Sequence, residues 1–287
     1  MKKLCLFFAV IMMTAFCAIS ANAQTEGEET GFTMTIGVDN STAYNWRGSR
    51  QSEKPFGYNV MPSLCFTWTG DVLGAEIGVY DTEEIGKSKE GNRFNEFGVW
   101  ATFSFFNFDL QFQSYGLNTL MWNKDYDYRP VYELGLSYTF SKIDFFQPKL
   151  SWYTIVGGDD FRWDVVKVDG EWEFTKTNKR AFSSYLELDL PFYIADGNVL
   201  IGGVLGLLPF YAPYYSHYEN RARLCNAGIY AGYTFDFNCG ISIPIKAEFG
   251  YSDLNREEMA KADGFKNKNG LYYGLTVSIN WTTWLGR

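Results

Sequence analysis

The single histidine of the chain, His217, is the first candidate for catalysis, because hydrolases often use a histidine as general base. Ser216 precedes it directly. A serine nucleophile must lie within hydrogen-bond reach of the histidine, and a polar group must orient the ring. Side chains of adjacent residues in an extended strand point apart. We therefore interpret His217 as a solvated loop residue and keep a hydrolase as the less favoured alternative.

Carboxylate pairs are candidates for metal binding, because Ca²⁺ prefers clustered oxygen ligands. Asp159 and Asp160 are adjacent, and one residue separates Asp125 from Asp127. Neither pair has the spacing of an EF-hand loop, so we interpret them as exposed loop acids. The cysteines after residue 23 have spacings that fit neither a disulfide framework nor a zinc site; they are Cys65, Cys225 and Cys239. The sequence therefore predicts no metal ion and no cofactor.

Aromatic side chains gather in two stretches between the regular segments. They are four tyrosines and two tryptophans: Tyr211, Tyr214, Tyr215, Tyr218, Trp163 and Trp172. Such rings can contact a sugar or a partner protein. Aromatic residues at the rim of a membrane barrel explain the same clusters equally well. The sequence leaves both interpretations open.

The segments that must position these residues alternate between apolar and polar positions. In residues 240–253 every odd position from Ile241 to Tyr251 is apolar, while the even positions include Lys246 and Glu248. Such alternation predicts a strand with one apolar and one polar face. Twelve segments of this kind follow one another: 32–47, 56–68, 72–81, 93–106, 108–117, 128–140, 143–156, 180–194, 199–211, 222–235, 241–252 and 270–282.

The connections between these segments are alternately short and long. Short turns are predicted near 69–71, 107, 141–142, 195–198 and 236–240, and long loops near 48–55, 82–92, 118–127, 157–179, 212–221 and 253–269. This rhythm is typical of an antiparallel up-and-down β-barrel with tight turns at one rim and long loops at the other. Asp169-Gly170 predicts a hairpin turn inside one long loop. Residues 254–262 predict a short helix in another.

The first 23 residues have the features of a cleaved signal peptide. Lys2 and Lys3 precede an apolar stretch, and Ala21-Asn22-Ala23 forms a small-x-small cleavage site. We therefore divide the chain into a signal peptide, residues 1–23, and a barrel, residues 24–287. Cleavage would take the formal net charge from −8 to −10, because both lysines are lost. Such an acidic chain is a poor partner for nucleic acid.

The distribution of charge indicates which face of the barrel points outward. The apolar face is almost free of charge, whereas the polar face carries charge in mid-strand, which favours an outer-membrane barrel with its apolar face in lipid. The predicted lumen-lining residues are Asp39, Arg47, Glu76, Glu96, Asp109, Glu133, Lys149, Glu187, Asp189, Lys246 and Glu248. Aromatic residues near strand ends are predicted to form membrane girdles; they are Phe56, Trp68, Tyr128, Phe140, Tyr251, Tyr273 and Trp281.

The stretch Ser41-Thr42-Ala43-Tyr44-Asn45-Trp46-Arg47-Gly48-Ser49-Arg50-Gln51-Ser52, followed by Pro55, resembles the opening of the TorF-type porin family. That family runs Ser-x-Tyr-x-aromatic-Arg-Gly-x-Ser-Gln-Ser; here two residues separate Ser41 from Tyr44, and Arg50 precedes Gln51. The stretch Gly70-Asp71-Val72-Leu73-Gly74-Ala75 is similar to the family's second turn. The resemblance implies a porin-type barrel without catalytic residues, and it names no solute.

We therefore expect an exported barrel of about twelve strands in the outer membrane, with extracellular long loops and periplasmic termini. It is expected to contact membrane lipid and to pass small hydrophilic solutes by passive or weakly selective diffusion, through a narrow pore. Arg47 is expected at the lumen mouth, where it could pair with an acidic wall residue. A non-conducting adhesion or binding barrel acting through its loops is the main alternative. The oligomeric state is not predicted.

Overall fold

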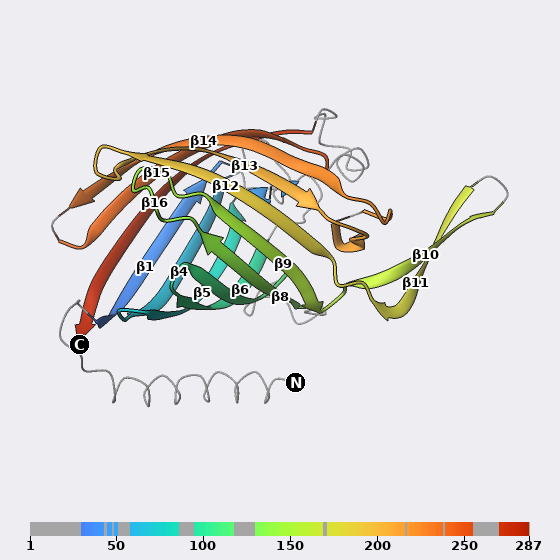
Figure 1. The fold of residues 1–287 in the computed structure, drawn as a ribbon, viewed down its shortest axis with the longest axis horizontal. Coiled ribbons are helices and arrows are strands. Elements are labelled where there is room, and N and C mark those ends of the chain that lie inside the picture. Colours follow the sequence, from blue (N-terminus) through green and yellow to red (C-terminus); the bar gives the residue numbers. More distant parts are fainter. Residues whose placement is uncertain are drawn as a thin grey trace.

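The computed structural model describes residues 30–42, 45–47, 49–50, 58–85, 95–117, 130–168, 171–215, 217–237, 239–254 and 270–286. In this part of the chain, twelve antiparallel strands form one closed barrel (Figure 1). The predicted all-β, up-and-down barrel is therefore confirmed. No helix among these residues is long and apolar enough to cross a membrane. The signal peptide predicted for residues 1–23 lies outside the described residues.

The barrel strands match the twelve predicted segments closely. They are β1 (Gly31–Ser41), β4 (Tyr58–Thr69), β5 (Leu73–Ile85), β6 (Asn95–Phe105), β7 (Phe108–Leu117), β8 (Val131–Thr139), β9 (Lys149–Gly157), β12 (Ser184–Ile194), β13 (Val199–Leu208), β14 (Arg223–Phe237), β15 (Ile241–Ser252) and β16 (Leu271–Gly286). β1 pairs with β4 on one side and with β16 on the other, which closes the ring. Closure leaves no edge with unpaired backbone groups.

The apolar face of the strands points out of the barrel. Ile229 is 65% exposed and Phe249 is 52% exposed, whereas Glu133, on a polar face, is 1% exposed. The same division runs along the stretch 241–251, where Phe249 and Tyr251 lie on the outer surface. A closed sheet with an apolar exterior and a polar interior is the arrangement of a transmembrane barrel.

Several predicted strands are too long at one end, and the two largest differences are in segments 32–47 and 143–156. The segment 32–47 stops as a barrel strand at Ser41, and Asn45–Trp46 forms β2, which pairs with β3 (Ser49–Arg50) in a separate small sheet. The chain therefore turns away from the wall where the alternation still predicted a strand. The segment 143–156 joins the barrel only at Lys149, because residues 140–148 form a longer turn in which Phe146 stacks on Phe192 of β12 at 4.4 Å.

The hairpin predicted within 157–179 is present. β10 (Phe161–Val168) pairs with β11 (Glu171–Arg180) and extends away from one end of the barrel (Figure 1). Asp169 and Gly170 at its tip, like the helix predicted for 254–262 beyond Leu254, lie outside the described residues. β11 ends at Arg180, the residue at which the segment 180–194 was predicted to begin. The barrel strand β12 therefore starts at Ser184.

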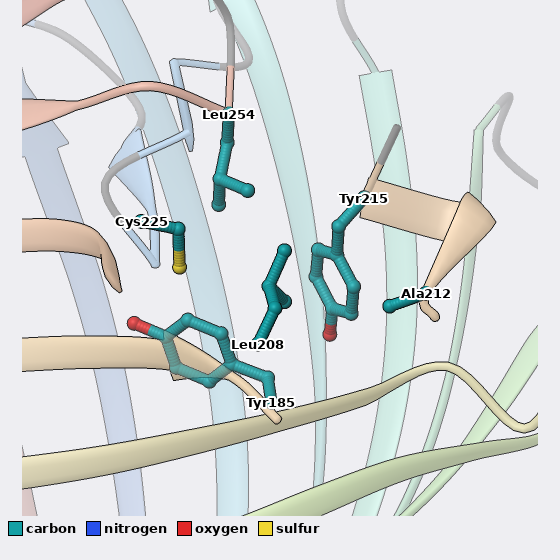
Figure 2. Packing of buried hydrophobic residues seen from close by; sticks show 6 residues of the cluster. All are labelled: Tyr185, Leu208, Ala212, Tyr215, Cys225 and Leu254. Carbon is teal, nitrogen blue, oxygen red and sulfur yellow. The ribbon is translucent and has the colours of Figure 1, made fainter. Parts of the chain in front are cut away.

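The interior is packed at the end of the barrel that carries the long loops, which we call the long-loop end. The core there joins Tyr185, Leu208 and Cys225 from the wall with Ala212 and Tyr215 from the connection between β13 and β14, and with Leu254 (Figure 2). The connection contains the 3-10 helix η1 (Pro213–Tyr215). Figure 2 shows Tyr215 reaching inward from η1 toward the side of the barrel that carries Tyr185. The opposite end, with the short turns, is called the short-turn end.

Candidate permeation path and plug

The β2–β3 hairpin lies inside the barrel and is held to two walls. Asn45 donates a hydrogen bond through Nδ2 to Oε1 of Glu248 on β15 at 2.7 Å. Arg47 reaches Glu133 on β8, which lies five strands further around the closed ring. The hairpin therefore spans the interior, and we call it the plug hairpin.

Arg47 forms a bidentate ion pair with Glu133. Its Nη1 donates to Oε2 at 2.7 Å and its Nη2 to Oε1 at 2.6 Å. The side chains are only 8% and 2% exposed. Nη1 also donates to the hydroxyl oxygen of Tyr215 at 2.5 Å. Parallel guanidinium–carboxylate bonds are strong and geometrically specific, so this contact fixes the plug hairpin in one orientation.

Aromatic rings surround the Arg47 guanidinium. Its Cζ lies 4.5 Å from the ring centre of Trp46, 4.0 Å from that of Tyr153 and 5.0 Å from that of Tyr185. Trp46 stacks on Tyr215, with centroids 5.6 Å apart and planes inclined by 13°. Cation–π contacts are worth about 2 kcal/mol when water is excluded. We call this assembly of Arg47, Glu133 and the surrounding rings the arginine cage.

Two features of Arg47 indicate that the contacts of the cage hold it in a conformation that is otherwise unfavourable. Its φ is 52°, in the left-handed region that costs a non-glycine residue about 1–2 kcal/mol. Burial is the largest single influence on the pKa of the guanidinium and lowers it, but Glu133, Tyr215 and Tyr115 together raise it by more, so the pKa lies above its ordinary value. Arg47 is therefore held as a buried cation in a strained conformation, which is a recurrent property of functional positions.

The η1 segment completes the cage from the long-loop end. The backbone N–H of Tyr214 donates to Oγ of Ser183 at 3.2 Å, and that hydroxyl donates to Asp160 at 2.7 Å. Burial raises the pKa of the Asp160 carboxyl above its ordinary value, and that of the Tyr215 hydroxyl as well. The loop acid Asp160 is therefore a buried structural acceptor rather than the exposed residue that was predicted. Asp159, by contrast, is exposed and pairs with Lys176.

The short-turn end of the interior contains a cavity of about 570 Å³. It extends from the turn at Gly70, Asp71 and Val72 to the ring of Tyr153, which also forms one wall of the arginine cage. Its polar lining residues include Thr67, Thr69, Asp71, Glu76, Thr102, Ser104, Asp109, Gln111, Ser137 and Lys149. The interior is therefore hollow and polar at the short-turn end, whereas side chains pack together at the long-loop end.

Three predicted lumen residues lie in this cavity. Lys149 pairs with Asp109, with Nζ 3.0 Å from Oδ2, and Ser104 donates to the other carboxylate oxygen. Glu76 accepts from Nε1 of Trp100 at 2.5 Å. The other predicted lumen residues lie outside this cavity.

The contacts of these other residues are mostly with tyrosines. Tyr80 donates to Glu96 at 2.8 Å, and Tyr230 donates to Asp189 at 2.6 Å. Lys246 lies 4.8 Å from the ring centre of Tyr230. In the strand register, Glu187 lies opposite Ser151 and Gly206, and Asp39 lies opposite Met61 and Ser278. Nζ of Lys246 lies 3.9 Å from Oε2 of Glu248. A role for these residues in lining a permeation path stays a prediction.

Inward-facing aromatic rings lie flat against glycines of the neighbouring strands. A Cβ at Gly98 would lie 2.2 Å from the ring of Tyr80, and one at Gly250 would lie 2.4 Å from that of Tyr272. Gly202 accommodates Tyr230 in the same way. Without a side chain at these positions, the rings take up space at the wall rather than at the barrel axis.

The predicted girdle residues that the structure describes lie near strand ends. Phe140, Tyr251 and Trp281 are 49%, 41% and 41% exposed. Trp68 and Tyr273 are partly exposed. Phe56 and Tyr128 lie outside the described residues. Contact of these rings with a membrane interface stays a prediction.

His217 is not the solvated loop residue that was predicted. It is 2% exposed, and its Nε2 lies 2.8 Å from the carbonyl oxygen of Arg221. Its backbone pairs with Ala212. The ring nitrogen is thus engaged by a backbone carbonyl, which gives His217 a structural explanation. Among the described residues, no three His, Cys, Asp or Glu side chains are grouped so as to hold a metal ion.

No family model and no curated protein matches this sequence, so membership of the TorF-type family stays a resemblance. Among solved structures, an outer membrane channel from Pseudomonas putida F1 is 10% identical, with a TM-score of 0.47, and the match covers 91% of this chain and 100% of the other. The P. putida toluene transporter TodX is 10% identical, with a TM-score of 0.44 and coverages of 91% and 91%.

A third match is an outer membrane phospholipase from Salmonella typhi, solved as a dimer with bound calcium. It is 11% identical, with a TM-score of 0.40 and coverages of 90% and 94%. Similarity at this level carries no argument about the function of this chain, which must come from its own interior.

The sequence indicated Arg47, Glu133 and Tyr215, but it did not identify the rings that the barrel wall contributes around them. Tyr115, Tyr153 and Tyr185 were not singled out, although each is a large ring at a polar-face position of its segment. Trp46 lies 5.7 Å from Tyr115, centroid to centroid. Aromatic residues that interrupt a polar face are the signal that could have located the cage.

Proposed function

We propose that this chain is an outer-membrane barrel that lets small hydrophilic solutes pass, passively or with weak selectivity. The observation that carries this proposal is the polar cavity of about 570 Å³ inside a barrel whose outer surface is apolar. In porins, the polar interior of the barrel is the channel through which hydrophilic solutes pass. In this proposal the long loops are extracellular, the termini periplasmic, and lipid is the partner of the outer face.

The arginine cage makes this a narrow path in the proposed function. A twelve-stranded barrel has an interior between those of eight-stranded barrels, which side chains fill, and sixteen-stranded porins with open channels. The plug hairpin occupies part of that interior, so we expect small conductance steps. The predicted lumen residues include eight acids, which outnumber the three bases Arg47, Lys149 and Lys246 and favour mild cation selectivity.

Planar-bilayer recording of the purified full chain tests the proposal. We expect small steps and a reversal potential in a salt gradient that shows cation preference. Liposome swelling with sugars of increasing size should show a low size limit. Anion selectivity would contradict the expected preference. Silence of both the wild type and a variant without Arg47 would overturn passage itself.

A non-conducting adhesion or binding barrel is the second candidate. The observation that favours it is the β10–β11 hairpin, which extends beyond the barrel and carries the exposed bases Arg162, Lys176 and Arg180 (Figure 1). This candidate predicts that loss of the hairpin abolishes partner binding and that no variant conducts. We propose no catalytic residue, because His217 is occupied by a backbone carbonyl.

A further inference from the structure

We propose that the cavity at the short-turn end is a binding site for small, hydroxyl-bearing organic cations, with Glu76 as the residue that sets the preference for positive charge. The inference rests on the proposed function, since it names the class of solute that would enter the path.

The cavity has the size and lining of a small-molecule site. Its volume of about 570 Å³ lies within the range of roughly 300–1,000 Å³ that is common for ligand pockets. Hydroxyl groups of Thr67, Thr102 and Ser137 and the amide of Gln111 line it. These groups both donate and accept hydrogen bonds, so they suit a ligand with several hydroxyl groups.

The charges of the cavity are not balanced. Lys149 is matched by Asp109 at 3.0 Å, and the two side chains are 37% and 28% exposed. Glu76 has a different environment, because its hydrogen-bond partners are neutral donors: Nε1 of Trp100 at 2.5 Å and Oγ1 of Thr67 at 3.4 Å. Among the described residues, no basic side chain forms an ion pair with Glu76.

The neutral donors orient Glu76 without neutralising it. An indole N–H and a hydroxyl each satisfy a lone pair of the carboxylate, but they leave its charge for a mobile cation. Trp100 is itself fixed, because its ring lies against Gly78, where a Cβ would be 2.2 Å away. Asp71 adds a second carboxylate to the cavity lining, and no basic side chain in the described part of the chain forms an ion pair with it.

Three sugars of nearly equal size test the assignment: glucosamine at mildly acidic pH, where it is a cation, neutral glucose, and anionic glucuronate. The folded full chain in detergent is titrated with each sugar. The indole N–H signal of Trp100 is followed by NMR and assigned with Trp100→Phe. We expect glucosamine to bind about three- to fivefold more tightly than glucose, as for an ion pair open to water, and glucuronate most weakly.

Substitutions locate the preference. Glu76→Gln should largely abolish the difference between glucosamine and glucose, whereas Asp236→Asn, which removes an exposed carboxylate that does not line the cavity, should keep it. Asp109→Asn leaves Lys149 unpaired and should raise the affinity for glucuronate, which provides a second test if Glu76→Gln does not fold. Equal affinities for the three sugars, no saturable shift, or an unchanged preference in Glu76→Gln would each overturn the site.

The results distinguish failure of the binding site from failure of the proposed function. Binding in the expected order, with silent bilayers for every variant, supports the site and contradicts passage. Conductance without saturable sugar binding supports passage and overturns the site.

Discussion

The two ends of the barrel interior use charged side chains in opposite ways. At the long-loop end, Arg47 and Glu133 satisfy each other, are almost fully buried, and are enclosed by rings. At the short-turn end, Glu76, Asp109 and Lys149 line an open cavity. One ring, that of Tyr153, belongs to both regions.

The difference separates structure from transport within one lumen. A buried ion pair with complete hydrogen bonding rigidifies its surroundings and excludes water. Charges in a wide, wetted cavity can exchange their partners with a passing solute. We infer that the long-loop end limits passage and that the short-turn end distinguishes between solutes.

The largest effect is expected from Arg47→Ala. Removing one partner of a buried ion pair costs about 3–5 kcal/mol, because Glu133 is left buried without its cation. The plug hairpin should leave its site, and single-channel conductance should rise several-fold. Arg221→Ala is the matched control, since Arg221 forms an ion pair with Glu219 in which both side chains are largely exposed. Equal conductance of Arg47→Ala and wild type would show that the cage is not the constriction.

A smaller effect is expected from Gly250→Val, which tests the packing of aromatic rings against glycines of the wall. The new side chain would collide with Tyr272, and such overpacking costs about 1–3 kcal/mol. The displaced ring should move toward the axis, so thermal stability and conductance should both fall. Gly203→Ala provides the control, because the nearest atom to its Cβ, the carbonyl oxygen of Gly228, is 3.4 Å away. If both variants melt at the same temperature, the glycine–ring packing is not a stabilising feature.

A still smaller effect is expected from His217→Ala. The substitution removes one hydrogen bond to the Arg221 carbonyl, worth about 1 kcal/mol. Thermal unfolding should show a slight loss, and bilayer conductance should not change. Hydrolysis of a phospholipid by the wild type that disappears in this variant would support the hydrolase alternative instead.

The smallest effect on conductance is expected from deletion of the β10–β11 hairpin. Residues 161–180 can be replaced by a short linker, because the N–H of Ala181 already donates to the carbonyl oxygen of Asp160 at 3.2 Å. Conductance should remain that of the wild type. Loss of channel activity in a correctly folded deletion would connect the hairpin to the path and weaken the contrast between the two ends.

The wall could be predicted from the sequence, whereas the cage could not. Alternation along 241–252 arises because the two faces of the sheet meet different environments. Each strand therefore shows the pattern in its own sequence, without reference to its neighbours. The contact of Arg47 with Glu133 joins residues 86 positions apart and leaves no local pattern. Even so, pairing of Arg47 with an acidic wall residue was expected, because an arginine beside an acidic lumen has few other partners.

The errors at strand ends have the same origin. The alternation continues past Ser41 although the chain leaves the wall there, because Trp46 faces rings of the interior rather than lipid. Apolar residues look the same in sequence whether a membrane or an aromatic core surrounds them. For the same reason His217 was assigned to solvent, since its burial depends on how η1 folds inward.

The positions of the cage residues along the chain indicate when the plug hairpin can bind during assembly of the barrel. Arg47 follows β1, but its partners come from β7, β8, β9, β12 and the segment after β13, and so are synthesised later. The plug hairpin can be seated only after most of the wall has formed, so its seating is a late event that reports a completed barrel. We expect the peptide bonds around residue 47 to be cut by a protease in unfinished barrels and to become resistant when maturation ends.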